Sequence, residues 1–267
     1  AEGAVASLED PVTAYVPELE GSAWGGTTIR QVLRMSSGVA FDETYGAEGA
    51  DVTHFFEDGV RGGRVNAVLL DFDDRAAEPG TQYNYSTADT QVLGWVLARA
   101  TGEDPAAYLA DRLWGPIGAA TDALWITDAP EGTVAAGMGI SATLDDWARF
   151  GRFAARGGVT GTSRTVALPE RWFAEATRPL DAVTAHGALY PDYPLGYGYQ
   201  WWSFPDGSFE AQGVYGQILF VDPALELVIV LTSAWETAWD DAAEAEFMAL
   251  VQAVRTELAA DSDRAGG

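Results

Sequence analysis

One stretch, between Glu78 and Gly102, constrains the fold more than any other, because it reads as a turn, a short extended run and a helix. A Pro-Gly pair marks the turn. Ser86 stands at the expected helix N-cap, with Asp89 three residues later as its capping-box partner. The apolar residues that follow recur at helical spacing: Val92, Leu93, Val96, Leu97 and Ala100. Gly102 is expected to end this helix at the C′ position.

Tyr85 directly precedes that N-cap. Unpaired backbone N–H groups and the helix dipole favour negative charge at the start of a helix. The position therefore predicts that the Tyr85 phenolate forms more easily than it does elsewhere. By itself, a Tyr-Ser-Thr triplet is more often an aromatic that packs against its own helix, so the surrounding motif has to decide.

The wider pattern, Pro-Gly-x-x-Tyr-x-Tyr-Ser-x-x-Asp-Thr-x-x-Leu-Gly, resembles the Tyr-x-Asn segment of the serine β-lactamase-like superfamily. The likeness is to its branch of class C β-lactamases, esterases and 6-aminohexanoate-oligomer hydrolases. The resemblance implies that Tyr85 takes part in proton transfer with a Ser-x-x-Lys pair. Thr87 stands where penicillin-recognising members carry Asn, which disfavours a β-lactam substrate and leaves the general hydrolase interpretation intact.

Composition narrows the class of protein. The 267 residues are 48% hydrophobic, enough to bury a substantial core, and no apolar run approaches the ~20 residues of a membrane span. The absence of cysteine excludes disulfides and thiolate metal sites. A net charge of −25, with 40 acidic against 15 basic residues, argues against nucleic acid and anionic membranes as partners. Salt adaptation is one explanation of this charge, and GC-rich coding that depletes lysine is another.

Every basic residue is arginine, so a Ser-x-x-Lys cannot occur in these 267 residues. The opening residues, with Asp-Pro-Val and Pro-Glu-Leu, resemble the stretch that follows the nucleophile helix in the superfamily. We therefore expect the serine and lysine to lie upstream, in a longer protein, and these residues to be inactive by themselves. The compartment and the oligomeric state are left undetermined by the sequence.

A second helix is expected after Thr28, which has Gln31 as a capping-box partner and Gly38 to close it. Ser36 and Ser37 follow this helix. Neither has a lysine three residues later or a Gly-x-Ser-x-Gly elbow, so neither is predicted to be a nucleophile.

The segment from Val39 to Asp74 is predicted to be rich in loops. It holds Tyr45, where related amide hydrolases carry a mobile tyrosine over the substrate, although a surface-loop aromatic is equally compatible. Asp71-Phe-Asp-Asp74 lacks the Gly and Glu of an EF-hand loop and is interpreted as a solvated acidic face. His54 and His186 lack ligand partners at helical spacing, so no zinc site is predicted.

Ser141 lies in a Gly-x-Ser-x-Thr segment that resembles the superfamily's Gly-x-Asn/Ser-x-Thr. The resemblance makes it a candidate hydrogen-bond donor to the substrate, and a second capping role is equally economical. Thr143 is expected to cap a helix over Leu144–Arg156. Pro169 is expected at the N1 position of a further short helix.

Strands are expected from residue 196 onward, where the periodicity changes to two. They are Gly196–Phe204, a hairpin turn at Pro205–Ser208, Val214–Val221 and Leu225–Ser233. The last strand is a continuous apolar run, which predicts cover on both faces. Thr237 is expected to open a final helix with these residues on one side: Phe247, Leu250, Val251, Val254 and Leu258.

A second candidate site motif, Ala-Gln-Gly-Val-Tyr-Gly-Gln, begins at Ala211. It resembles the third superfamily motif, which is Gly-x-x-Gly-Gln in the esterase and amidase branch. The resemblance implies that the Val214 N–H completes an oxyanion hole, a donor typically worth about 3 kcal/mol, and that Gln212 and Gly213 contact substrate. A glycine-rich strand start or bulge is the plainer reading. Gln212 in place of lysine again disfavours a β-lactamase.

The resemblance implies an α/β (α+β) fold of the β-lactamase/transpeptidase type over residues 1–267, with an antiparallel sheet flanked by helices. A mostly helical lobe is expected over 20–190, strands and a helix over 191–260, and a disordered tail over 261–267. The N-terminal strands and the nucleophile helix of that fold would lie outside this chain.

The function implied is a metal-independent serine hydrolase that cleaves a small-molecule amide or ester through an acyl-enzyme, with no cofactor. Tyr85 would shuttle protons. The competing hypothesis is a non-catalytic relative that keeps the pocket and binds a peptide or small ligand.

Overall fold

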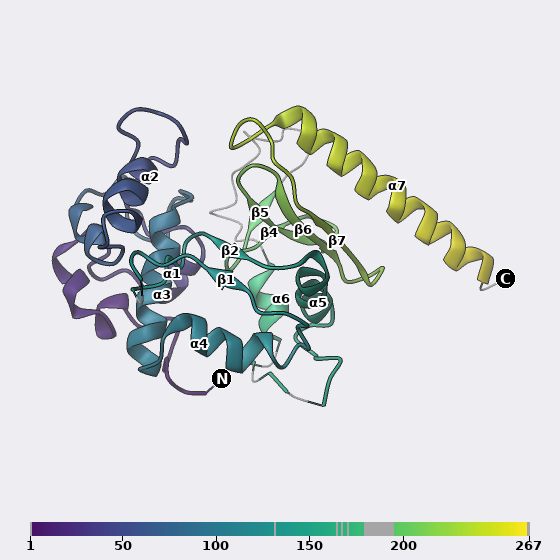
Figure 1. The fold of residues 1–267 in the computed structure, drawn as a ribbon, viewed down its shortest axis with the longest axis horizontal. Coiled ribbons are helices and arrows are strands. Elements are labelled where there is room, and N and C mark those ends of the chain that lie inside the picture. The colour runs from purple at the N-terminus through teal and green to yellow at the C-terminus, as the bar shows by residue number, and fades with distance from the viewer. Residues whose placement is uncertain are drawn as a thin grey trace.

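The structure is a computed structural model that describes residues 2–130, 132–163, 165–166, 168–169, 171–178 and 195–265, without the side chains of 261–265. Helices and loops from the first half of the chain lie on one side, and an antiparallel sheet lies on the other (Figure 1). The expected mixture of a helical part with an antiparallel sheet is therefore present.

The helical part is built on one apolar core from the first 135 residues. Its helices are α1 (Ile29–Leu33), α2 (Asp51–His54), α3 (Thr87–Thr101) and α4 (Pro105–Leu109). π-helical turns continue α2 to Val60 and α4 to Trp114. Short 3-10 segments fill the intervals: Val12–Ala14, Pro17–Gly21 and Ala67–Asp71.

Five antiparallel strands form the main sheet in the order β3-β4-β5-β6-β7. They are β3 (Gly196–Tyr197), β4 (Trp202–Ser203), β5 (Phe209–Gly213), β6 (Gln217–Asp222) and β7 (Leu227–Leu231). A separate two-stranded sheet pairs β1 (Leu124–Trp125) with β2 (Ile140–Ser141).

Helices cover both faces of the main sheet. The helices α5 (Leu144–Ala155) and α6 (Trp172–Ala176) share one core with one face, and α7 (Asp241–Ala265) shares another with the opposite face. Alternation along β6 explains the division, because Leu219 belongs to the first core and Phe220 to the second.

Arg255 ties α7 to two hairpin turns of the sheet. It forms ion pairs with Asp206 at 2.7 Å and Asp222 at 2.9 Å. Asp222 is buried and also accepts the backbone N–H groups of Ala224 and Leu225. These contacts fix α7 near its C-terminal half, beyond the apolar contacts of its first turns.

Three expected helix caps are confirmed. Thr28 forms a complete capping box with Gln31 at the start of α1. The Thr143 hydroxyl accepts the Asp146 N–H at 3.2 Å at the start of α5. Gly102 follows α3 in the left-handed conformation, with φ of 70°.

Ser86 also caps α3 as expected, accepting the Asp89 N–H at 3.3 Å, but Asp89 does not complete a capping box. Its carboxylate instead accepts the indole N–H of Trp24 at 2.7 Å, 65 residues away in sequence. Burial raises the pKa of Asp89 to about 7, against hydrogen bonds from Trp24 and Ser37 that lower it. A long-range partner therefore replaces the local one.

Two helix boundaries were predicted wrongly. The helix α1 ends at Leu33 with Arg34 as its C-cap, so Gly38 does not close it. Gly38 has φ of 81°, and a Cβ there would lie 2.3 Å from the Ala77 carbonyl oxygen, so glycine is required by a tertiary contact. The helix α6 begins at Trp172 and not at Pro169.

The predicted strand Gly196–Phe204 is in fact a hairpin of β3 and β4, with Gln200 in its turn at φ of 61°. The predicted turn at Pro205–Ser208 is confirmed by the Phe204 N–H, which donates to the Ser208 carbonyl at 2.9 Å. The strand β5 was not predicted, and Val214 lies in the turn that follows it rather than in a strand.

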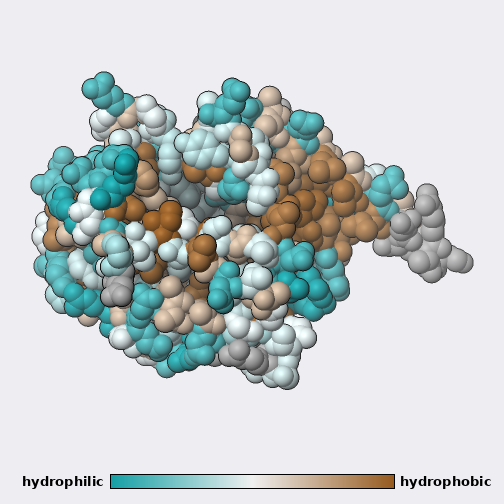
Figure 2. Space-filling model, in the orientation of Figure 1, coloured by the Kyte–Doolittle hydropathy of each residue, from teal (hydrophilic) through white to brown (hydrophobic). Residues whose placement is uncertain are grey.

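Within the described part of the chain, β7 pairs only with β6, and all five of its residues are half-buried. Its side chains nevertheless pack on both faces, Val228 and Val230 against the core with α5 and the other three against the core with α7, so the predicted cover on both faces is present but partial. Figure 2 shows a broad apolar surface beside α7 on this side of the molecule.

The last helix starts later and ends later than predicted. The Asp240 carboxylate accepts the N–H groups of Ala242 and Ala243, so the helix begins after Asp240 and not at Thr237. It continues to Ala265, into the stretch expected to be a disordered tail. Of its predicted apolar face, Phe247 and Val251 are buried, whereas Leu250 is 55% and Leu258 37% exposed. None of the helices in the described residues is both long and apolar enough to cross a membrane.

Candidate active site

Tyr85 lies where the helical part meets the sheet. Its ring stacks on Trp202 of β4, with centroids 5.9 Å apart and planes 10° apart, and meets Tyr197 of β3 edge-on at 6.1 Å. Met35 and Tyr83 complete this aromatic cluster. The Met35 sulfur accepts the Ser86 N–H at 3.4 Å. Segments more than 100 residues apart in sequence therefore hold the Tyr85 ring.

Glu43 occupies the start of α3, next to Tyr85. One of its carboxylate oxygens accepts the Thr87 N–H at 2.8 Å, and the other accepts the Thr87 hydroxyl. Glu43 is half-buried, and burial raises the pKa of its carboxyl although hydrogen bonds from Thr87 and Tyr45 oppose the shift. A backbone N–H at the start of α3, which has no acceptor within the helix, therefore donates to an anionic side chain.

The prediction that the Tyr85 phenolate forms easily is not supported. Burial raises the pKa of Tyr85 well above its ordinary value, and the neighbouring Glu43 carboxylate raises it further. The helix N-terminus cannot offset this because its positive end is taken up by Glu43. Tyr85 is therefore a neutral hydroxyl at physiological pH.

Tyr45 reaches the same place from the loop before α2. Its hydroxyl donates to Glu43 at 3.0 Å and lies 3.5 Å from the Thr87 hydroxyl. The side chain is 40% exposed. The structure therefore brings Tyr45 and Tyr85 to one helix terminus, with Tyr45 partly open to solvent.

Gln212 is turned toward two carboxylates. Its side-chain amide donates to Glu210 at 2.5 Å and to Glu244 of α7 at 3.1 Å. Burial raises the pKa of the Glu210 carboxyl to about 8, and Glu244 adds to this shift while Gln212 opposes it. The amide is thus engaged within the protein, which leaves no free donor of Gln212 for the predicted substrate contact.

The end of β5 is open. Gly213 is exposed and pairs with Gln217 as the last residue pair before the turn. Val214 follows it, half-buried, and its N–H has no acceptor among the described residues. A free backbone N–H at a strand end is what an oxyanion donor requires.

Ser141 is exposed on β2, and none of its contacts within the described residues joins it to Tyr85. The chain approaches α3 earlier, at Gly137. A Cβ there would lie 2.5 Å from the Thr87 carbonyl oxygen, so glycine is required for this close approach. The segment before β2, rather than Ser141, therefore packs against the start of α3.

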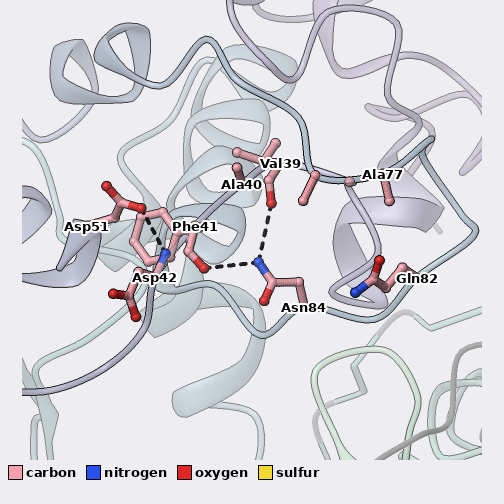
Figure 3. A pocket seen from close by; sticks show the side chains of 10 residues that line it. Val39, Ala40, Phe41, Asp42, Asp51, Ala77, Gln82 and Asn84 are labelled. Atoms are coloured by element: carbon pink, nitrogen blue, oxygen red, sulfur yellow. Dashed lines mark hydrogen bonds between the residues drawn. The ribbon is translucent and has the colours of Figure 1, made fainter.

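A cavity of about 310 Å³ is lined in part by Asn84, the residue before Tyr85, and by the segment from Gly38 to Asp42 (Figure 3). The Asn84 amide donates to the carbonyls of Val39 at 3.2 Å and Phe41 at 3.0 Å, as the dashed lines show. Asn84 thereby ties the residue before Tyr85 to the Val39–Phe41 lining of this cavity.

The acidic stretch after Leu70 is exposed at Asp71, Asp73 and Asp74, as predicted, although Asp71 is also paired with basic side chains. Asp71 binds His54 at 3.1 Å and Arg64 at 2.9 Å, and the other ring nitrogen of His54 meets Asp58 at 2.9 Å. The part of the chain that the structure describes holds no group of three side chains placed to bind a metal ion. His186 lies outside the described residues.

An antiparallel sheet between helices, beside a helical part that presents a tyrosine at a helix start, is the arrangement expected of β-lactamase-like proteins. The Beta-lactamase family model matches residues 1–253, so the chain belongs to this family. The predicted superfamily and fold class are confirmed.

Two relatives are closely similar. The chain is 34% identical over 235 residues to a 6-aminohexanoate-dimer hydrolase of Paenarthrobacter ureafaciens, an alignment that covers 84% of this chain and 59% of that protein. A putative 6-aminohexanoate-dimer hydrolase from Bacillus anthracis has a TM-score of 0.74 at 25% identity, covering 97% of this chain and 66% of its own.

A family VIII carboxylesterase shares the fold, with a TM-score of 0.65 at 17% identity over 90% of this chain and 74% of its own. The chain spans about three fifths of the length of the curated relative.

Sequence reasoning missed Glu43, Trp202 and Tyr197. Glu43 lies 44 residues before Thr87, and Trp202 lies in a run that was interpreted as one continuous strand. No local pattern distinguishes either from an ordinary loop acid or strand aromatic, so only the fold could identify them.

Proposed function

We propose that the full-length protein is a serine hydrolase that cleaves a small-molecule amide or ester through an acyl-enzyme. The observation that carries this proposal is the position of Tyr85, held against Trp202 at the start of α3 with Tyr45 beside it. Identity of 34% to a protein named 6-aminohexanoate-dimer hydrolase supports it.

In this mechanism, a serine supplied from outside these 267 residues attacks the carbonyl carbon, and its proton passes to a neighbouring lysine. The Val214 N–H and the serine's own N–H stabilise the oxyanion. Because Tyr85 is neutral, it acts as a hydroxyl relay that passes a proton to the leaving amine or alcohol. Water then attacks the carbonyl carbon of the acyl-enzyme. The ester bond to the serine breaks, the carboxylic acid is released, and a proton returns to the serine oxygen.

Tyr45 is proposed to contact the substrate with the part of its side chain that is exposed. Gly213 is proposed to let the protein backbone at the end of β5 lie close to the substrate, because glycine has no side chain. For Ser141 and Gln212, the contacts within the described residues do not favour a substrate role. The two are therefore left out of the proposed site.

The test is an acyl-enzyme trap on the full-length protein. It would be incubated with a p-nitrophenyl ester of a short acid, quenched early and analysed by peptide mass spectrometry. The proposal expects one acylated serine, three residues before a lysine, and saturable turnover unaffected by a chelator. Tight ligand binding without acylation or turnover would favour the non-catalytic alternative and overturn the proposal.

The 267 residues alone are the matched control in that experiment. They hold no lysine and are expected to show no turnover above buffer. Saturable turnover by these residues would contradict the assignment of the nucleophile to another segment.

A further inference from the structure

A second feature of the fold lies away from the aromatic cluster, around Tyr199. Tyr199 is buried, and two guanidinium groups lie against its ring, that of Arg34 at 5.0 Å and that of Arg30 at 5.6 Å from the centroid. Trp172 packs on the same ring at 5.5 Å. The Arg30 guanidinium also donates to the Tyr199 hydroxyl.

The two arginines differ in whether a carboxylate lies next to their guanidinium group. Arg30 forms an ion pair with Glu9. Arg34 is only 9% exposed, and within the described residues its guanidinium has neither a hydrogen-bond acceptor nor an ion-pair partner. Its Nε is completely covered. A buried cation normally has an anionic partner, because burial removes the water that would otherwise solvate the charge.

The surroundings of Arg34 add positive charge. Burial lowers the pKa of the Arg34 guanidinium below its ordinary value, and Arg30 and Arg178 lower it further, whereas Glu9 and Glu175 act in the opposite direction. This concentration of arginine stands out in a chain with 15 basic and 40 acidic residues. Cation–π contact with Tyr199 stabilises the guanidinium plane but supplies no acceptor for its N–H groups.

We propose that Arg34, with Arg30 beside it on the ring of Tyr199, forms a binding site for a small oxyanion, and that a carboxylate is its ligand. The planar fork of a guanidinium presents two parallel N–H groups that match the two oxygens of a carboxylate. The ring of Tyr199 fixes the orientation of that fork before the ligand arrives. The site is separate from Tyr85 and does not depend on the proposed hydrolase activity.

The test measures stabilisation of the purified protein by anions at constant ionic strength, with chloride as the balancing salt. The probes are acetate, succinate and inorganic phosphate. Carboxylates at about ten times their dissociation constant should raise the melting temperature by roughly 2–4 °C. A larger shift with phosphate than with acetate and succinate would assign the ligand to phosphates and overturn the carboxylate.

Arg34→Gln removes the fork and should abolish the anion-dependent shift. Arg61→Gln is the matched control, because Arg61 is an exposed arginine paired with Glu57 on the surface, and the same charge is lost. The control should keep the full shift. An equal shift in the Arg34 and Arg61 variants would mean general screening and would overturn the site.

Arg34→Lys keeps the charge and loses the planar fork, and it remains informative if Arg34→Gln fails to fold. It should weaken the binding of acetate, followed by calorimetric titration, by at least tenfold. Affinity within twofold of the unsubstituted protein would show that the fork does not bind the anion. A purely structural Arg34 would lower the melting temperature equally with and without acetate, which would likewise overturn the proposal.

Discussion

The backbone N–H of Thr87 donates to the Glu43 carboxylate across 2.8 Å, so the first turn of α3 takes its anion from a loop 44 residues earlier. The Thr87 hydroxyl donates to the same carboxylate. The helix start next to Tyr85 is therefore closed by a fixed negative charge. Burial of Tyr85 raises the pKa of its hydroxyl, and this carboxylate raises it further, so Tyr85 is neutral although its position in sequence had favoured the phenolate.

Replacing Tyr85 by Phe in the full-length protein tests its chemical role. The change removes the hydroxyl and keeps the ring that stacks on Trp202. General acid–base groups contribute about 10²–10⁴-fold, so kcat for a p-nitrophenyl ester should fall by about that factor with an unchanged melting temperature. Turnover within a few-fold of that of the unsubstituted enzyme would contradict the proton-relay role of Tyr85.

Glu43→Ala tests the long-range cap of α3. The free energy of unfolding, measured by urea denaturation, should fall by about 1–2 kcal/mol because the Thr87 N–H loses its acceptor. Glu48→Ala is the control in the same loop, since Glu48 is exposed, and it should stay within about 0.5 kcal/mol. Equal losses in the two variants would refute the capping role.

Asp146→Ala should destabilise the fold more strongly. The buried carboxylate accepts hydrogen bonds from Ala120, Thr121, Thr143 and Arg149. Burial alone would raise the pKa of Asp146, but these hydrogen bonds outweigh it and hold the pKa well below its ordinary value. Leaving the donors unpaired should cost about 3 kcal/mol or more.

Asp145→Ala is the matched control for that experiment. Asp145 is the exposed neighbour in the first turn of α5, and its removal should cost less than about 1 kcal/mol. A loss at Asp146 no larger than this would contradict the inferred network.

Glu210→Gln tests the buried carboxylates between β5 and α7. A folded pKa of about 8 lies above the unfolded value, so the folded state binds the extra proton, and its stability falls as pH rises from about 4.5 to 8. The neutral amide of the variant does not titrate, so its stability does not fall in this way. The free energy of unfolding of the variant should therefore exceed that of the unsubstituted protein by about 1–2 kcal/mol at pH 8 and differ little from it at pH 5. Parallel pH profiles would show that Glu210 does not titrate in this range.

Salt should stabilise the fold if repulsion among its 40 acidic residues is significant. The melting temperature should then rise between low and molar NaCl, as the Debye length falls from tens of ångströms to about 3 Å. A flat or falling curve would favour coding bias as the origin of the composition.

The helices α1, α3 and α5 were predictable because their signals are local, whereas α2 and α4 were not predicted. Thr28 with Gln31, Thr143 and Gly102 each act within one turn of their own helix. The motif around Tyr85 identified the family for a similar reason, since its residues are contiguous in sequence. Strand periodicity located the sheet but merged β3 with β4, because nothing local marks the turn at Gln200.

The sequence alone determined the family, the candidacy of Tyr85 and the caps formed by Thr28, Ser86, Thr143 and Gly102, because each depends on residues within a few positions of one another. Tertiary structure decided that Asp89 binds Trp24, that Gln212 faces Glu210 and Glu244, and that Arg34 has no anion among the described residues. These outcomes depend on which side chains meet across the fold. Burial then sets their protonation and their freedom to bind, and burial is a property of the assembled core rather than of any one segment.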